Sequence, residues 1–370
     1  MSRSSALLMD NWTLEDVGEL LSEGPNGEKA SELHLTDDGE RYFYKDVSWD
    51  VVAFECLAQT LSNIVLTDVC YVDSDNSGSW IGRYDCLSIL SDKEVVRTRS
   101  FGQNRDLWVP TRELIAEALL TCPEMRATHE ENKKAFSEDR ELPDEMLSQV
   151  IHGGAGMMAR ARLSEMTYVA HPQRERLIQH GAFMLHPSSA GQRFNQVLHS
   201  TRMNLYQRAD AKGLFAQLNL PPVAIQIINE ANGTDDLLIT ALQMRDRFKP
   251  LREWLTELQH ELEGDDAPAV LSKLKLLTEL GQSLEVRPID QLLGSSTLQM
   301  GVADLAPKVT LKVGLINSIR NRFGVRSQIT KLLLTEPGLK AVRRFCGFFQ
   351  KRHSEYAIRL ELDLQRRWAQ

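Results

Sequence analysis

A cluster of three glycines near the middle of the chain decides between two very different folds. The cluster lies between residues 153 and 156, within a stretch, Leu147–Pro187, that also holds four of the nine histidines. Its segment Gly154–Ala159 matches the G-x-G-x-x-A turn of a dinucleotide-binding fold, where glycines let the backbone approach a pyrophosphate. That interpretation requires a strand over residues 147–152 and an acidic residue at the end of the next strand.

The residues that follow do not complete this pattern. The expected second strand, Thr167–His171, ends in histidine where a ribose-binding carboxylate belongs, and Glu175 lies in a predicted helix. The chain also lacks the regular alternation of strands and helices that such a fold needs. We therefore prefer a helical interpretation, in which the glycines end one helix, Ala155–Met166 forms the next, and a third runs from Pro172 to about Phe183.

The arginines and histidines of this region support a third interpretation. Two pairs, Arg174 with His180 and Arg193 with His199, have the R-x4-6-H spacing of metal-independent ribonucleases of the HEPN type. Such a pair on one helical face would bind the scissile phosphate and move the 2′-hydroxyl proton. Chance alone gives roughly one to two such matches in this chain. The spacing therefore carries little weight, and the ribonuclease is kept as an alternative function.

Composition indicates an ordinary globular protein. The chain has 370 residues, of which 42% are hydrophobic and 25% are charged, and this is enough to build the cores of two or three domains. The N-terminal apolar run is too short for a signal peptide, and no later stretch approaches the length of a membrane span. We expect a cytosolic protein without a membrane partner.

The five cysteines do not form a recognisable framework. Their odd number and the absence of C-x-x-C spacing argue against a disulfide scaffold and against a zinc cluster. Most are expected to be buried thiols. The stretch Asp73–Gly78 resembles the first half of a calcium loop, but Tyr84 stands where the closing glutamate belongs, so we interpret it as a turn. The sequence thus predicts neither a metal nor a cofactor.

Hydrophobic periodicity predicts a mainly α fold, with a multi-helix, bundle-like C-terminal part and a smaller α+β N-terminal part. The first predicted helix covers residues 13–23, with Thr13 as its N-cap, and a strand is expected over Ile64–Val72. Further helices are predicted over residues 49–63, 111–120, 192–212, 223–231 and 251–262, and a second strand over residues 309–313. From these elements we predict four segments: an α+β part (1–122), a charged linker or solvated helix (123–144), a helical domain (145–307) and a basic helical segment (308–370).

Several short segments resemble a set of uncharacterised bacterial proteins to which no activity is attached. They are Ile64–Asp68, Met158–Ala161, Tyr168–Arg174, Asp236–Arg245 and Leu251–Leu255. Together the similar regions span about two thirds of the chain. The resemblance implies a bacterial, cytosolic protein and nothing about its chemistry.

The net charge of −8 conceals a strong asymmetry. Residues 308–370 contain fourteen Lys and Arg against four acidic residues, a net charge of +10, so the first 307 residues carry −18. Basic side chains interleaved with phenylalanines favour contact with a phosphate backbone. The residues predicted to bind nucleic acid or an acidic protein partner are Arg320, Arg322, Arg326, Arg343, Arg344, Lys351 and Arg352.

The competing interpretation is that the acidic part of the same chain neutralises this segment. The two differ in a testable way: nucleic-acid binding requires at least two of Arg320, Arg322 and Arg326 to be exposed and unpaired, beside an exposed Arg343 or Arg344. On this basis we predict a cytosolic binding or regulatory protein. Catalysis and homo-oligomer formation are both left open.

Overall fold

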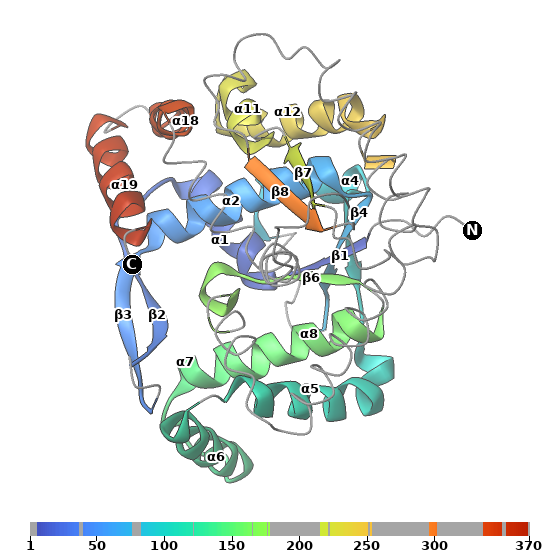
Figure 1. Ribbon diagram of the computed structural model, residues 1–370, viewed down its shortest axis with the longest axis vertical. Coiled ribbons are helices and arrows are strands. Elements are labelled where there is room, and N and C mark those ends of the chain that lie inside the picture. Colours follow the sequence, from blue (N-terminus) through green and yellow to red (C-terminus); the bar gives the residue numbers. More distant parts are fainter. Residues whose placement is uncertain are drawn as a thin grey trace. The chain divides into compact units, whose positions relative to one another are not determined.

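The computed structural model of the protein contains two compact units (Figure 1). We call residues 6–57 and 69–195 the α/β unit, and residues 1–5, 58–68 and 196–370 the helical unit. The structure describes residues 6–36, 40–75, 83–120, 122–164, 166–175, 177, 215–220, 223–250, 252–253, 296–301, 336–349 and 353–368. Helices predominate among these residues, as predicted. None of the helices searched in this part of the chain is long and apolar enough to cross a membrane.

A parallel sheet of four strands forms the centre of the α/β unit. The strands are arranged in the order β5 (Val96–Arg99), β4 (Val69–Asp73), β1 (Ala6–Met9) and β6 (Thr167–Val169). The chain enters the sheet at β1, adds β4 and β5 on one side, and then adds β6 on the other side of β1. The direction of growth therefore reverses between β1 and β6. In open parallel sheets, ligands bind outside the carboxyl ends of the strands at such a reversal.

This sheet corrects the expectation that strands and helices do not alternate. Between β1 and β4 lies α2 (Trp49–Leu66), and between β5 and β6 lies α5 (Arg105–Leu119). The strands are only three to five residues long, which is too short for a clear period of two. The predicted strand over Ile64–Val72 begins only at Val69, because α2 continues through Leu66.

The first helix, α1 (Asn11–Glu23), also begins earlier than predicted. Asp10, rather than Thr13, is its N-cap, because the Asp10 side chain accepts a hydrogen bond from the backbone N–H of Trp12 at 3.1 Å. A carboxylate suits this position, where unpaired N–H groups carry partial positive charge. The strand β1 thus passes directly into a helix capped by a buried aspartate.

The glycine cluster lies inside a continuous helical stretch. The dinucleotide turn was therefore wrong, and the helical interpretation was right about the helix after the glycines but wrong in ending a helix at them. The helix α7 (Glu145–Ser148) passes into a π-helical turn, η2 (Gln149–Gly153), and then into α8 (Gly154–Leu163). No strand precedes the glycines, and they do not end a helix. The helix α8 packs against α5 (Figure 1).

Close approach by arginine side chains accounts for two of these glycines. A Cβ atom on Gly153 would lie 2.5 Å from Nη2 of Arg174, and one on Gly156 would lie 3.2 Å from Nη1 of Arg160. The first distance is far inside van der Waals contact. The cluster makes room for buried guanidinium groups, whereas the sequence suggested that it made room for a pyrophosphate.

An antiparallel hairpin and a charged helix complete the described part of this unit. The hairpin pairs β2 (Lys29–Leu35) with β3 (Tyr42–Ser48), and α4 (Asp85–Asp92) precedes β5. The charged segment, left open as a linker or a helix, contains α6 (Pro123–Ser137).

The helical unit contains two described helix pairs and a second hairpin. The helices are α11 (Val223–Glu230), α12 (Thr234–Arg247), α18 (Glu336–Gly347) and α19 (His353–Trp368), and the strands are β7 (Phe215–Leu220) and β8 (Ser296–Gly301). Phe345 of α18 and Leu364 of α19 are fully buried. The predicted helices over 192–212 and 254–262 and the strand over 309–313 lie outside the described residues.

Candidate functional site at the carboxyl edge of the parallel sheet

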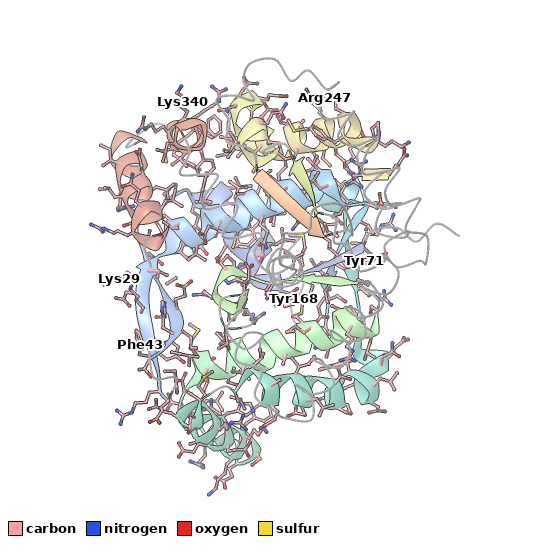
Figure 2. The ribbon with its side chains drawn as sticks, in the orientation of Figure 1. Lys29, Phe43, Tyr71, Tyr168, Arg247 and Lys340 are labelled. Atoms are coloured by element: carbon pink, nitrogen blue, oxygen red, sulfur yellow. The ribbon has the colours of Figure 1, made fainter. Side chains whose placement is uncertain are left out.

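Charged side chains follow three of the four parallel strands. Asp10 comes directly after β1, Asp73 is the last residue of β4, and His171 lies two residues beyond β6. All three side chains are buried. Figure 2 labels Tyr168 on β6, which reaches the first of these residues. Since the strands are parallel, the three residues share one edge of the sheet, and this edge is the candidate site.

The first charged group at this edge is an arginine and an aspartate joined by two hydrogen bonds. Nη1 of Arg174 donates to both carboxylate oxygens of Asp10, at 2.7 and 2.8 Å, and Nη2 donates to the carbonyl of Gln149 at 3.2 Å. The Tyr168 hydroxyl also donates to Asp10. The Arg174 guanidinium lies 3.7 Å from the centre of the Trp12 ring, which is a cation–π contact.

The electrostatics of this group show that each charge compensates the other. Burial raises the pKa of Asp10, but Arg174, His171 and the Tyr168 hydroxyl together outweigh burial and bring that pKa below its ordinary value. Burial lowers the pKa of Arg174, but Asp10 and Tyr168 together raise it above its ordinary value. Both groups are therefore held firmly in their charged forms.

The second group has the same composition but is poorly paired. Nε of Arg160 lies 3.4 Å from Oδ2 of Asp73, and its Nη1 lies 3.9 Å from the Met157 sulfur. Among the described residues, neither Nε of Arg160 nor Nε of Arg174 has a hydrogen-bond partner, so the two arginines differ at their Nη groups. The guanidinium lies 4.0 Å from the centre of the Trp108 ring, and the Arg112 guanidinium lies 5.5 Å from the same ring.

The pKa shifts of this second group run opposite to those of the first. Burial raises the pKa of Asp73 above its ordinary value, and Arg160 does not offset it. Burial likewise lowers the pKa of Arg160, and Asp73 does not offset it. Each member is therefore buried with less compensation than its charge requires.

A third polar group surrounds Asp16 of α1. Nε2 of His171 lies 2.9 Å from Oδ2 of Asp16, and Sγ of Cys56 lies 3.9 Å from the same oxygen. Nε1 of Trp49 donates to the other carboxylate oxygen at 3.4 Å. The three candidate ligand atoms of Asp16, Cys56 and His171 all lie within 4.8 Å of one another. These are the described residues with the right atoms to hold a metal ion.

Two further histidines form a separate pair, away from the strand ends. The rings of His129 and His152 lie 5.0 Å apart edge to face, and Nε2 of His152 lies 3.5 Å from Glu113. Burial lowers the pKa of His129 to about 4 and also lowers that of His152. Both rings are therefore neutral at pH 7, which suits packing more than proton transfer.

Arg174 is the one described member of the two predicted ribonuclease pairs. Its Nη1 donates to Asp10, its Nη2 donates to the carbonyl of Gln149 and its face lies against Trp12, so both Nη groups are already engaged. His180, Arg193 and His199 lie outside the described residues.

The basic residues predicted in the C-terminal segment are only partly described. Arg343 is exposed and forms a bidentate ion pair with Glu361 at 2.8 Å, and Arg344 donates to the carbonyls of Ile228 and Ala231. Glu361 belongs to the basic segment itself, so this pair is not neutralisation by the acidic part of the chain. The residues that lie outside the described part of the chain are Arg320, Arg322, Arg326, Lys351 and Arg352.

The cysteines agree with the prediction, and the strand-end charges were missed. Four of the five cysteines are buried and all five are free. Asp10 and Asp73 each follow a short apolar run, ALLM and VCYV, and a charge at the end of such a run is the signal that would have found them.

No family model, curated protein or solved structure matches this chain.

Proposed function

We propose that the α/β unit is a ligand-binding module that takes a phosphate-bearing small molecule at the carboxyl edge of its parallel sheet, with Arg160 as the principal contact. The observation that carries this proposal is the poor pairing of Arg160. A guanidinium has five N–H donors and keeps its charge. Arg160 is buried, yet among the described residues its donors meet one carboxylate at 3.4 Å and one thioether sulfur.

The chemistry of the vacant donors favours an anion. An arginine fork matches the paired oxygens of a phosphate, and such charge-assisted hydrogen bonds are among the strongest in proteins. Arg112 brings a second cation to the same Trp108 ring. Arg112 also donates to Glu113 at 2.6 and 3.1 Å, so Arg160 remains the principal contact for the anion.

The position of Arg160 supports the same conclusion. Its partner Asp73 ends β4, next to β1 in the sheet, so the guanidinium lies at the edge where ligands of open parallel sheets bind. Gly156 leaves space beside the Arg160 guanidinium, because a Cβ atom on this residue would lie 3.2 Å from Nη1 of Arg160. A phosphate here would supply the missing acceptors and offset the cost of burying the cation.

Calorimetric titration with inorganic pyrophosphate tests this proposal. We expect binding by the wild-type chain and a loss of affinity of at least about tenfold in Arg160→Gln, corresponding to one lost charged hydrogen bond. Arg162→Gln is the matched control, because Arg162 is an exposed arginine on the same helix. Equal affinities in the two variants, or no binding by the wild type, would remove the proposal.

A second candidate function is contact between residues 308–370 and nucleic acid or an acidic protein. Its support is the net charge of +10 in this segment. Arg343 is already paired with Glu361, so the test belongs at Arg320 and Arg322. Charge reversal of both residues should weaken oligonucleotide binding, and the wild-type affinity should fall steeply with salt. Undetectable binding at low salt would leave only an acidic protein partner.

The remaining expectations from the sequence are proposals of the same kind. They are a cytosolic location, a bacterial source, a bundle-like arrangement of the C-terminal helices, and ribonuclease activity by Arg193 with His199. RNA cleavage in the presence of EDTA, lost in His199→Ala, tests the last of these.

A further inference from the structure

The polar group around Asp16 brings three potential metal-ligand atoms within 4.8 Å of one another. Oδ2 of Asp16 faces both the imidazole of His171 and the thiol of Cys56, while Oδ1 accepts from Trp49. The ligand-bearing atoms come from α1, from α2 and from His171, two residues beyond β6. Three elements therefore bring an oxygen, a sulfur and a nitrogen to one point beside the reversal of the sheet.

We propose that Asp16, Cys56 and His171 form a binding site for a divalent transition metal ion of the zinc class. Zinc is bound by thiolate, imidazole and carboxylate, and its catalytic sites use three protein ligands with a fourth position open. The thiolate in this set selects against Mg²⁺ and Ca²⁺, which prefer oxygen ligands. This site is distinct from Arg160 and does not rest on the proposed phosphate binding.

The distances fit this assignment with small movements. Zinc–sulfur bonds of about 2.3 Å and zinc–nitrogen bonds of about 2.0 Å place tetrahedral ligand atoms roughly 3.3–3.6 Å apart. The observed 2.9 Å from His171 to Asp16 and 3.9 Å from Cys56 to Asp16 bracket that range. A metal ion would lengthen the first contact and shorten the second, each by a few tenths of an ångström.

The protons and charges of the site also balance. The backbone N–H of Gln173 donates to Nδ1 of His171 at 3.3 Å, so without metal the imidazole carries its proton on Nε2. On metal binding this proton moves to Nδ1, the long contact with Gln173 is lost, and the Cys56 thiol releases its proton to solvent. The product, one dication with one thiolate, one carboxylate and a neutral imidazole, has no net charge. A neutral complex suits a place where Cys56 and His171 are buried.

The burial of the three ligands indicates where the open coordination position of the metal would lie. Cys56 is fully buried and His171 nearly so, whereas the Asp16 side chain is 17% exposed. Water or a substrate would therefore reach the metal beside Asp16. A metal ion in this position, close to the end of β6, would act on a ligand bound at the same edge of the sheet.

Cobalt titration of the full-length protein, purified in the presence of a chelator, tests the proposal. We expect one equivalent of Co²⁺ to produce a thiolate-to-cobalt charge-transfer band, which one equivalent of Zn²⁺ removes. Cys56→Ser should lose this band and weaken zinc binding more than about 100-fold, since even indirect partners of a metal are worth 10–100-fold. Cys70→Ser is the matched control, because Cys70 is equally buried in β4, and it should keep the band.

A second variant keeps the test valid if Cys56→Ser does not fold. Asp16→Asn retains a hydrogen-bond acceptor for His171 but loses the anionic ligand, and it should weaken zinc binding by a similar factor. Glu15→Gln, one residue away, should not. Zinc affinity should also rise about tenfold per pH unit below the thiol pKa, because one proton is released. Absence of the band in the wild type, or its retention in both Cys56→Ser and Asp16→Asn, would overturn the site.

Discussion

Two buried arginine–aspartate pairs stand at the same edge of one sheet, each stacked on a tryptophan, and they differ in how well their charges are satisfied. Arg174 donates twice to Asp10 at 2.7 and 2.8 Å, whereas Arg160 approaches Asp73 only to 3.4 Å. The pKa shifts point in opposite directions in the two pairs. We call Arg174–Asp10, which is joined by two short hydrogen bonds, the complete pair, and Arg160–Asp73, which has none, the incomplete pair. We propose that the complete pair is structural and that the incomplete pair is a ligand site.

The largest expected effect on stability comes from a substitution that breaks the complete pair. Arg174→Met leaves the Asp10 carboxylate buried without its cation, and this should lower the free energy of unfolding by about 3–5 kcal/mol. Chemical denaturation of the purified variant measures it. A loss below about 1 kcal/mol would mean that Asp10 finds another partner and that the two pairs are not different in kind.

The next largest effect on stability is expected from a substitution in the glycine cluster. Gly153→Ala places a Cβ atom 2.5 Å from Nη2 of Arg174, a group already fixed by Asp10. We expect a destabilisation of about 1–3 kcal/mol from overpacking. Gly154→Ala is the matched control, because a Cβ atom there would lie an ordinary 3.6 Å from Cδ of Arg174. That variant should gain up to about 1 kcal/mol from helix propensity. Thermal unfolding of the two variants measures both changes in stability. Equal changes would contradict the prediction, because they would mean that Arg174 moves away from the added Cβ atom.

The incomplete pair should matter less to stability. Arg160→Met loses the contact with Trp108 but also removes a buried cation with few hydrogen bonds, and these two effects oppose each other. We expect a change of about 1 kcal/mol or less in the free energy of unfolding without added ligand. A loss as large as that of Arg174→Met would show that Arg160 is a structural residue.

The smallest effect is in the pH dependence of stability. The pKa of Asp10 is lowered by folding, so its contribution is present above the unfolded value of about 3.9 and is lost as pH falls through the lower folded pKa. The pKa of Asp73 is raised by folding, so Asp73 opposes folding increasingly as pH rises from about 3.9 through the higher folded pKa. Asp10→Asn should flatten acid destabilisation, and Asp73→Asn should raise stability near neutral pH relative to low pH. Unfolding curves between about pH 2 and pH 7 would contradict this if both variants shifted the profile in the same direction.

The sequence predicted the helical content and a strand that overlaps β4, but it did not predict how the four strands of the sheet pair. Long periodic segments such as α1 and α11 were found within a few residues. The strands were obscured because three to five residues carry little periodicity, and β6 is separated from β1 by most of the α/β unit. Long-range pairing of this kind leaves no local pattern in a single sequence.

The residues of the site were noticed in part, but for the wrong reason. Arg174 was selected by its spacing to a histidine, whereas its role is set by Asp10, 164 residues earlier. The glycines were selected as a phosphate turn, although Gly153 makes room for that same arginine. Cys56 sits on the apolar face predicted for its helix, and only the fold brings Asp16 and His171 to it. Sequence chemistry identified unusual residues, and tertiary contacts decided what they do.

One measurement tests the central claim that the incomplete pair is a ligand site. The free energy of unfolding is measured for the wild type and for Arg160→Met, with and without pyrophosphate. The account predicts similar values without ligand. At a ligand concentration a hundred times the wild-type Kd, it predicts a gain of about 2.7 kcal/mol in the wild type and of about 1.4 kcal/mol or less in Arg160→Met, whose affinity is expected to be at least about tenfold lower. An equal gain in Arg160→Met, or no gain in either protein, would contradict it.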